Sequence, residues 1–312
     1  MRARWRRRTY PLVRPLRVAS VELRERTVIE LQLDDRWAEL SPLPGLHREA
    51  LNDLVPLLPD AVGLASATTG GYRDRLATLN DDPRWRALPP SLRCGLEGAL
   101  LESVADLGRP TRPMRPTAIL VDQDPGAPLE QLIGTTCAKV KIGRRPLAAE
   151  AALIRDVRRT LPDHAEIRLD ANRAFTLDEA IDLASAVDLV PACIEEPLRD
   201  PAEMPVFHER TGWPLALDET LHEPGHADLA TGPGVVAWVL KPARLGIHDT
   251  LAAFDRAPED VACIVSSCFE GLVGLGLLME LAEVAPGHPA PGLGTVDWFA
   301  DEGRTSRWTT IR

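Results

Sequence analysis

The sequence predicts an α/β protein in which a closed β/α barrel follows a separate α+β module. Two observations support the barrel. From residue 115 onward, short apolar runs end in polar or charged residues, and each run precedes a stretch with helical spacing of apolar side chains. The polar ends of successive runs lie roughly 25 residues apart, which is the length of one strand–helix unit in such a barrel.

Eight apolar runs are candidates for the barrel strands. They alternate with helical patterns such as 146–161 and 176–190, in which apolar residues recur at i, i+3 and i+4. An open doubly wound sheet is the competing architecture, but it usually has a Gly-rich phosphate loop after its first strand, and the sequence has none there. The clear runs are TAILVDQ, CAKVKIG, EIRLDAN, ACIEEP, PLALDE, AWVLKP and ACIVSSC, and a weaker one is PAPGLGT.

The chain divides into three predicted parts. Residues 1–112 form the α+β module, residues 113–295 form the barrel, and residues 296–312 pack back on the module. The segment GRPTRPMRPT, rich in proline and arginine, marks the boundary before the barrel. Within the module a basic first strand is expected, then antiparallel strands at 21–35 and 37–44 and helices at 47–58 and 89–108.

Composition narrows the classes of partner. The net charge of -10 argues against a general nucleic-acid binder, since the only basic cluster is the start of the chain. That start lacks the apolar core of a secretory signal, and no apolar run approaches the roughly 20 residues needed to cross a bilayer. The five cysteines contain no C-x-x-C pair, which favours a reducing cytoplasm. We expect a cytoplasmic protein without membrane insertion, and its state as a monomer or a homo-oligomer is left open.

Three of the polar strand ends are carboxylates: Asp170, Glu195 and Asp218. The last inward-facing residues of barrel strands meet on one rim. A lone carboxylate there is as often a helix cap or an ion-pair partner, but three on successive strands repel one another unless a cation joins them. A hard divalent ion with oxygen ligands resolves this repulsion, so Mg²⁺ is expected, with Mn²⁺ as a substitute. Zinc is disfavoured, because no His or Cys lies at a neighbouring rim position and the histidines show no ligand spacing.

Lysines flank the acidic trio on both sides. Lys141 ends the strand before Asp170, and Lys241 ends the strand after Asp218. A closed ring places these two amines on opposite sides of a metal-bound substrate. Lys139 shares a strand face with Lys141, and like-charge repulsion between them lowers the pKa of a lysine towards the range that a base needs. The alternative is that the lysines only form salt bridges with the acids and take no part in the chemistry. For Lys139 this alternative is nearly as strong as a functional role.

These residues indicate one reaction class. A small-molecule carboxylate substrate held by a metal beside a neutral lysine can lose the proton on the carbon α to the carboxylate. The metal then stabilises the enediolate that forms. An alternative from another class is a barrel that has lost catalysis and serves as a binding protein. Loss of catalysis should have removed at least one of the three carboxylates or of the two lysines at 141 and 241, and all five are present.

Several motifs resemble a known group of enzymes. The series AKVKIG, IRLDANRAF, IEEPL, LALDET and VLKP is similar to the muconate-lactonising subgroup of the enolase superfamily. Within it, WAELSPLPGLHREA, ERTGWPLALDETLHEP, IVSSCFEGLVGLGLL and PGLGT resemble the o-succinylbenzoate synthase family. The resemblance covers most of the chain and implies a modified (β/α)7β TIM-like barrel with an N-terminal α+β capping domain.

The resemblance also implies a reaction. It is the Mg²⁺-dependent syn elimination of water from 2-succinyl-6-hydroxy-2,4-cyclohexadiene-1-carboxylate to give o-succinylbenzoate, a step of menaquinone biosynthesis. By analogy Lys141 removes the α-proton and returns it to the departing hydroxyl, while Lys241 stabilises the enediolate. Asp170, Glu195 and Asp218 match the metal-ligand positions.

Supporting roles are expected for residues next to these. Arg168 shares the inward face with Asp170 and would orient the substrate or the lysine pair. Asn172 is an amide close to the site, and Glu196 points to the opposite face of its strand.

The succinyl tail of the substrate needs its own contacts. The stretch SSCFEG precedes an apolar helix, so hydroxyls and helix N-terminal N–H groups would form an anion site. The candidates are Ser266, Ser267 and Gly292, and residues 41–45 are expected to form part of a lid.

Two departures from the family concern the substrate. The loop at 17–28 is shorter than expected, and Phe175 stands where tryptophan is common. The lysines and the metal would equally serve an N-succinylamino acid racemase, a dipeptide epimerase or a muconate cycloisomerase of the same subgroup. These remain alternatives.

Overall fold

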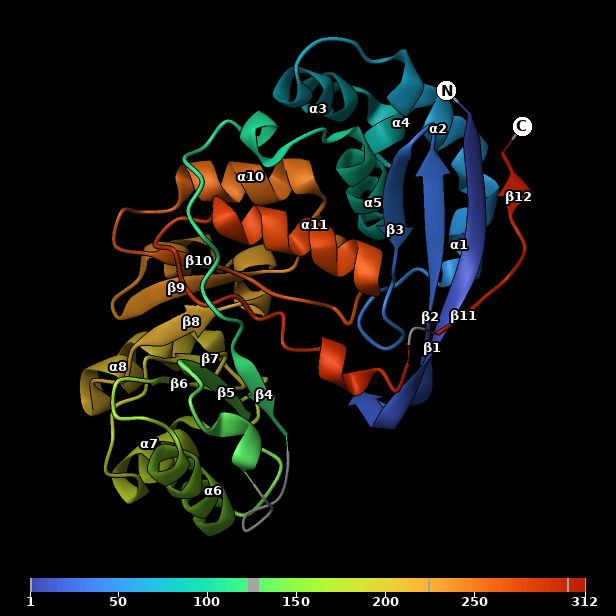
Figure 1. Ribbon diagram of the computed structural model, residues 1–312. Coiled ribbons are helices and arrows are strands. Elements are labelled where there is room, and N and C mark those ends of the chain that lie inside the picture. Colours follow the sequence, from blue (N-terminus) through green and yellow to red (C-terminus); the bar gives the residue numbers. More distant parts are fainter. Residues whose placement is uncertain (1, 123–128, 224, 302, 312) are drawn as a thin grey trace.

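The computed structural model describes residues 2–122, 129–223, 225–301 and 303–311, which form two sheets (Figure 1). A parallel sheet curls into the barrel, and an antiparallel sheet lies beside it as a cap. The predicted fold class, a (β/α)7β barrel with an N-terminal cap, is confirmed. The parallel strands are β4 (Ile119–Val121), β5 (Cys137–Lys141), β6 (Glu166–Asp170), β7 (Cys193–Glu195), β8 (Leu215–Leu217), β9 (Val235–Leu240) and β10 (Ala262–Val265).

The barrel strands pair in chain order, so each lies parallel to the next. The ring is closed by the segment after the last helix, where Gly292 bridges Ser266 and Gly294 bridges Ile119 of β4. A Cβ on Gly294 would lie 2.5 Å from the carbonyl oxygen of Ala118, so only glycine allows this approach. The weak eighth run of the sequence therefore supplies bridges rather than a full strand, and the open doubly wound sheet is excluded.

Helices cover the outside of the barrel (Figure 1). Between β8 and β9 the described residues form two 3-10 helices, η5 (Glu219–His222) and η6 (Ala227–Thr231), instead of an α-helix. Across the described part of the chain, no helix combines the length and apolar character needed to cross a membrane. The barrel helices are α6 (Leu147–Thr160), α7 (Leu177–Ala186), α8 (Met204–Thr211), α9 (Pro242–Leu245), α10 (Ile247–Arg256) and α11 (Leu272–Glu283).

The cap sheet is built on a long hairpin of β1 (Ala3–Val18) and β2 (Val21–Leu33). Only residues 19–20 lie between these strands, so the expected loop at 17–28 is mostly strand. The edge strand β3 (Arg36–Leu40) pairs with β2, while the C-terminal strands β11 (Arg304–Thr305) and β12 (Thr309–Thr310) pair with β1. The cap helices are α1 (Leu51–Leu54), α2 (Leu58–Ala67), α3 (Tyr72–Asp81), α4 (Pro83–Arg86) and α5 (Pro90–Leu100).

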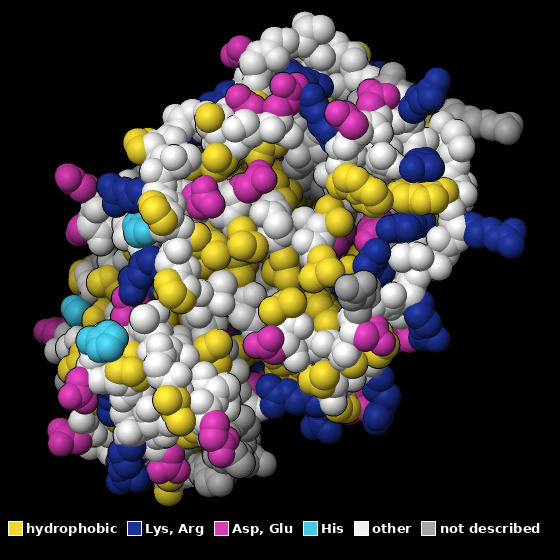
Figure 2. Space-filling model, in the orientation of Figure 1, with side chains coloured by type: hydrophobic (Ala, Val, Ile, Leu, Met, Phe, Trp, Pro, Cys, Tyr) yellow, Lys and Arg dark blue, Asp and Glu magenta, His cyan; other side chains and the backbone are white. Residues whose placement is uncertain are grey.

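Part of the positive charge at the arginine-rich start of the chain is paired with a glutamate of the cap sheet. Arg6 and Arg8 each place Nε 2.6 Å from a carboxylate oxygen of Glu30 on β2. The Glu30 side chain is only 2% exposed, so these ion pairs satisfy a buried charge. Figure 2 shows Lys and Arg side chains gathered over the cap-sheet side of the molecule. This strand has a structural role that its sequence alone did not reveal.

Two buried glutamates of the cap bind the N-terminal ends of barrel helices. Glu97 of α5 accepts a hydrogen bond from the N–H of Ile247 at the start of α10, at 2.5 Å. Glu39 of β3 accepts hydrogen bonds from Gly271 and Gly274 at the start of α11, at 2.7 and 3.1 Å. The first N–H groups of a helix lack partners within the helix and carry partial positive charge, so carboxylates stabilise them. An apolar cluster formed by the cap sheet, α5, α10 and α11 completes this interface.

Substitution of Gly95 would test how closely α5 packs on β3. A Cβ at this position would lie 2.5 Å from the carbonyl oxygen of Glu39, which is backbone and cannot rotate away. We expect Gly95→Ala to lower the free energy of unfolding by about 1–3 kcal/mol in urea denaturation. The control is Gly63→Ala in α2, where nothing lies within 4 Å and the free energy should rise by about 0.5–1 kcal/mol. A Gly95 variant as stable as the native protein would contradict this packing.

Candidate active site

The three predicted metal ligands lie at the carboxyl ends of neighbouring strands. Asp170 is the last residue of β6 and pairs in register with Glu195, the last residue of β7. Asp218 follows β8 directly. Their exposed fractions are 0%, 4% and 1%. Because ionised carboxylates are costly to bury, three in this position need positive charge beside them.

Two lysines of β5 supply part of that charge. The Nζ of Lys139 lies 2.7 Å from Oδ2 of Asp170 and 2.6 Å from Oε2 of Glu195. The Nζ of Lys141 lies 2.6 Å from the same Asp170 oxygen and donates a hydrogen bond to Oδ1 of Asn172 at 2.9 Å. The expected amide close to the site is therefore a direct partner of the predicted base.

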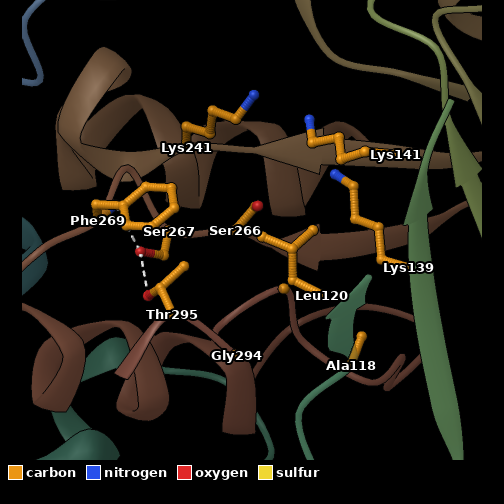
Figure 3. Close-up of a pocket in the computed structure, with 11 residues that line it drawn as sticks. Ala118, Leu120, Lys139, Lys141, Lys241, Ser266, Ser267, Phe269, Gly294 and Thr295 are labelled. Atoms are coloured by element: carbon orange, nitrogen blue, oxygen red, sulfur yellow. Dashed lines mark hydrogen bonds between the residues drawn. The ribbon is translucent and has the colours of Figure 1, made fainter. Parts of the chain in front are cut away.

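Lys241 approaches from the other side of the ring. It follows β9 and forms an ion pair with Asp218. Figure 3 shows its amine and that of Lys141 directed into the same space from different strands. The chain contains 33 arginines and only three lysines, and all three lysines lie in this site. Because arginine keeps its proton in proteins and lysine can lose it, this usage is a further sequence signal for an amine base.

Burial and charge act in opposite directions on these groups. Burial would raise the pKa of Asp170, but Lys139 and Lys141 outweigh it and hold the pKa well below its usual value. Burial would lower the pKa of Lys139, but Asp170 and Glu195 outweigh it and hold the pKa above its usual value. Burial and the nearby Asp170 raise the pKa of Glu195 to about 7, against the effect of its contact with Lys139. Glu195 is thus the carboxylate that these lysines compensate least.

The carboxylates fit a hard cation by their chemistry. Oδ1 of Asp170 and Oε1 of Glu195 are buried and have no hydrogen-bond partner within the described ranges. With Asp218 they form an all-oxygen donor set, which Mg²⁺ prefers. Still, no three His, Cys, Asp or Glu side chains of the described residues are grouped as metal ligands, and the amines of Lys139 and Lys241 lie against the carboxylates instead. Binding of a divalent ion therefore requires these amines to withdraw.

Two residues just beyond the strands have backbone in the left-handed region. Asn172 has φ 45° and Glu196 has φ 42°; asparagine adopts this region more readily than most residues, whereas for glutamate it is costly. Glu196 faces away from the lysines, as expected. It accepts hydrogen bonds from the N–H groups of Asp218 and Thr220 at 2.8 and 2.9 Å and pairs with Arg173 at 2.9 Å. Glu196 thereby fixes the turn that carries Asp218.

A cavity of about 740 Å³ lies between the strand ends and the cap. Lys141 and Lys241 line its barrel wall. Its cap wall comes from residues 16–19 at the hairpin turn and from Leu43, Gly45 and Leu46 after β3. The predicted lid segment therefore contributes two of its residues, and the hairpin turn overlaps the segment at 17–28 that the resemblance linked to the substrate.

The three predicted substrate-binding residues line a smaller pocket together with the lysines. Figure 3 shows Ser266 and Ser267 in its wall. Ser266 is 5% exposed, and a Cβ on Gly292 would lie 2.8 Å from its Oγ, so a side chain there would displace the hydroxyl. The hydroxyl of Ser267 is held by the protein, at 2.7 Å from Glu270 and 3.0 Å from Thr295. Ser266 is therefore the hydroxyl better able to reach a ligand.

The anion site expected at the start of α11 is filled by the protein itself. The N–H groups of Gly271 and Gly274 donate to Glu39 of the cap, and the N–H of Cys268 donates to Glu270 at 2.6 Å. A substrate carboxylate would have to displace buried carboxylates there. The helix N-terminus does bind a carboxyl group, as the sequence indicated, but that group belongs to a cap side chain.

Arg168 also differs from its expected role. It shares the inner face of β6 with Asp170 but lies two residues nearer the amino end of the strand. Its guanidinium donates to the carbonyl oxygen of Ala290 at 2.7 Å and to Glu166 at 2.8 Å. It lines neither pocket described above. Arg168 ties β6 to the segment that closes the barrel instead of orienting the lysines.

Comparisons with known proteins agree with this architecture. The family model described as Enolase C-terminal domain-like matches residues 129–305, which is more than half of the chain. The match defines an enzyme of the enolase superfamily. An o-succinylbenzoate synthase from Enterobacter sp. (strain 638) is 31% identical over 311 residues, covering 94% of this chain and 89% of that protein. The chain belongs to the o-succinylbenzoate synthase family, whose members are lyases.

Solved structures share the fold at lower identity. The o-succinylbenzoate synthase of Thermosynechococcus elongatus BP-1, complexed with Mg in the active site, matches with a TM-score of 0.70 at 24% identity, over 96% of this chain and 95% of that chain. The L-Ala-D/L-Glu epimerase of Bacillus subtilis matches with a TM-score of 0.77 at 17% identity, over 97% and 91%. One fold thus carries different reactions, so specificity must come from the cavity wall.

Glu39 predicts a pH dependence of stability. Burial, opposed by the hydrogen bonds from Gly274 and Gly271, raises its pKa from 4.5 to about 7. A carboxyl whose pKa is raised on folding stabilises the fold fully below its unfolded value, and this contribution is lost as the pH rises through the folded value. We expect the native protein, with a chelator present, to lose stability between these pH values, and Glu39→Gln to remove about 3 kcal/mol of that loss.

The measurement is urea denaturation at pH 5, 6, 7 and 8. The matched control is Glu209→Gln on α8, an exposed glutamate with the same change in charge, which should leave the pH profile unchanged. An equal slope in the native protein and the Glu39 variant would mean that Glu39 is ionised in the fold across this range.

Proposed function

We propose that this protein removes water from 2-succinyl-6-hydroxy-2,4-cyclohexadiene-1-carboxylate by Mg²⁺-dependent syn elimination and so forms o-succinylbenzoate for menaquinone biosynthesis. The observation that supports the proposal is the placement of Lys141 and Lys241 in the wall of one cavity, on strands separated by those that carry the buried carboxylates. Membership of the family suggests the substrate. A cavity of about 740 Å³ is ample for a small dicarboxylate.

Asp170, Glu195 and Asp218 are the residues that would hold the ion. Two of their oxygens are buried and have no hydrogen-bond partner in the described part of the chain, and Glu195 has a raised pKa that a divalent cation would relieve. When bound, Mg²⁺ supplies positive charge for the substrate carboxylate as the adjacent carbon loses its proton. The Mg complex of the T. elongatus enzyme supports this choice of ion, and Mn²⁺ shares the same preference for oxygen ligands.

Lys141 takes the α-proton in this proposal. Oxygens of Asp170 and Asn172 lie 2.6 and 2.9 Å from its Nζ and so fix where the amine points. After Lys141 has released its own proton to solvent, the C–H bond breaks and its proton passes to the neutral amine. The C–O bond to the hydroxyl then breaks, and Lys141 returns the proton to that oxygen, which leaves as water. Because one amine serves both steps, the proton and the hydroxyl leave from the same face.

Lys241 acts from the other side as a charged group. Burial would lower its pKa, but Asp218 and Glu195 outweigh it and hold the pKa above its usual value. As an ammonium group, Lys241 would stabilise the negative charge that develops on the substrate. Lys139 bridges Asp170 and Glu195 in the structure, and its amine would leave these two side chains when the ion binds.

The first test of the function is direct. Purified protein with Mg²⁺ should dehydrate the cyclohexadiene substrate, followed as loss of its ultraviolet absorbance. A chelator should abolish turnover, and added Mg²⁺ should restore it. Independently of turnover, Mg²⁺ should raise the melting temperature of the native protein but not of Glu195→Gln, because the variant lacks one ligand.

The racemase alternative belongs in the same experiment. Two lysines on opposite sides of a cavity also suit removal of a proton from one face and its return to the other. An N-succinylamino acid is therefore offered under the same conditions. Racemisation without dehydration would replace the proposed function by this alternative, and turnover in excess chelator would contradict the role of the metal.

Substitution of Lys141 separates a base from a salt-bridge partner. Lys141→Arg keeps a positive charge beside Asp170 but cannot lose its proton. We expect both Lys141→Arg and Lys141→Ala to lower kcat by roughly 10²–10⁴-fold while the far-ultraviolet circular dichroism spectrum stays native. If Lys141 only neutralises Asp170, the arginine variant should retain most of the rate, and that result would assign the base elsewhere.

A further inference from the structure

His47 lies between the cap and the barrel, with both ring nitrogens hydrogen-bonded. The backbone N–H of Leu43, in the same cap loop, lies 2.9 Å from Nδ1. Nε2 lies 3.1 Å from the carbonyl oxygen of Ala243 in α9. Because a backbone N–H can only donate, Nδ1 accepts and Nε2 carries the proton that it donates to Ala243. Its two partners thus hold the imidazole neutral in one tautomer.

Both ends of this bridge belong to the cavity. On the cap side, Leu43 and Leu46 line the wall. On the barrel side, Lys241 lines the wall, lies two residues before Ala243 and is the N-cap residue of α9. The hydrogen bond from His47 therefore joins the cap wall to the segment that carries Lys241.

Arg26 makes a second tie to the same cap loop. It is 2% exposed, and its guanidinium donates to the carbonyl oxygens of Ser41 and Pro42 at 2.6 and 3.0 Å. It also donates to the carbonyl oxygen of Phe269 in the loop after β10, at 3.0 Å. The cap loop is thus fixed at its start by Arg26, and His47 alone joins its end to α9 among the hydrogen bonds of the described residues.

We propose that His47 is a positioning residue for the reaction: it couples the cap loop at 41–47 to the end of β9, so that the cavity wall and Lys241 are set together. This inference rests on the proposed function, in which Lys241 stabilises the developing charge. The bridge holds only while the ring is neutral, because a protonated Nδ1 would face the N–H of Leu43 as a second donor.

The surroundings of His47 favour the neutral ring. Burial lowers its pKa, and Arg26 of β2 and Arg244 of α9 act in the same direction. The carbonyl of Ala243 and Glu49 of its own segment act against them. The net shift is downward, so the bridge is intact near neutral pH.

Three variants separate the bridge from the local shape of the loop. His47→Leu removes both hydrogen bonds. His47→Asn keeps an acceptor near the position of Nδ1 but is too short to reach Ala243, whereas His47→Gln carries a donor to about the position of Nε2. With Mg²⁺ present, we expect the Leu and Asn variants to lower kcat/KM about 10-fold or more, and the Gln variant to recover most of the loss. The control is His208→Leu, which removes a histidine-to-carbonyl contact with Trp213 away from the site and should change nothing.

A spectroscopic readout does not need turnover. Protein labelled with [¹³C]lysine has only three lysine Cε signals, and Lys241→Arg identifies that of Lys241 by its loss. In the Leu and Asn variants at position 47 we expect the Lys241 signal to shift more than those of Lys139 and Lys141. In the Gln variant it should return towards the native position.

The outcomes distinguish the two proposals. If the native protein fails to dehydrate the substrate while the Lys241 signal responds as expected, the proposed function falls and the bridge stands. Equal kcat/KM in the Asn and Gln variants would overturn the bridge, since His47 would then only shape its own loop. An unmoved Lys241 signal in the Leu variant would overturn it as well.

Discussion

Three carboxylates buried at neighbouring strand ends cannot stay charged without cations beside them, and the structure of the site follows from this constraint. Asp170 and Asp218 each have a lysine against them, while Glu195 shares Lys139 and keeps a raised pKa. Lys139, Lys141 and Lys241 equal the three carboxylates in number, but one oxygen each of Asp170 and Glu195 has no hydrogen-bond partner among the described residues. Such a site is suited to a divalent cation, because the ion prefers a set of oxygen donors.

The cap is also attached to the barrel through buried carboxyl groups. A helix N-terminus favours an anion, and the cap provides Glu39 for α11 and Glu97 for α10. Both contacts are buried, so they fix direction as well as distance. The cap therefore cannot slide over the barrel without exposing carboxylates and N–H groups that have no other partner in this interface. This is why side chains of the hairpin turn and of the loop after β3 can form one wall of a cavity whose floor belongs to the barrel.

The sequence was sufficient for much of the fold and site because both depend on local periodicity. Strand ends repeat at near-constant spacing, so the residues of one rim could be identified without coordinates. The sequence was insufficient where the role of a residue depends on which side chain, distant in the sequence, lies next to it in the fold. The start of α11 has the features of an anion site, but Glu39 occupies it. Arg168 lies on the same strand face as the site but nearer the amino end of the strand, where it binds the carbonyl of Ala290. The need for glycine at position 294, where the barrel closes, is explained only by the neighbouring carbonyl of Ala118.

The use of lysine gives the last step of the argument. A chain with 33 arginines has no general need of lysine for surface charge, so the three lysines that remain mark positions where guanidinium would fail. Guanidinium is larger, planar and permanently charged, whereas an amine can fit between carboxylates, yield to a metal ion and give up a proton. In the proposed function the strand ends carry the chemistry, and they would carry it for any substrate with an acidic C–H next to a carboxylate. Discrimination between such substrates falls to the cap wall, and so to the contacts at Arg26 and His47 that hold the wall in place.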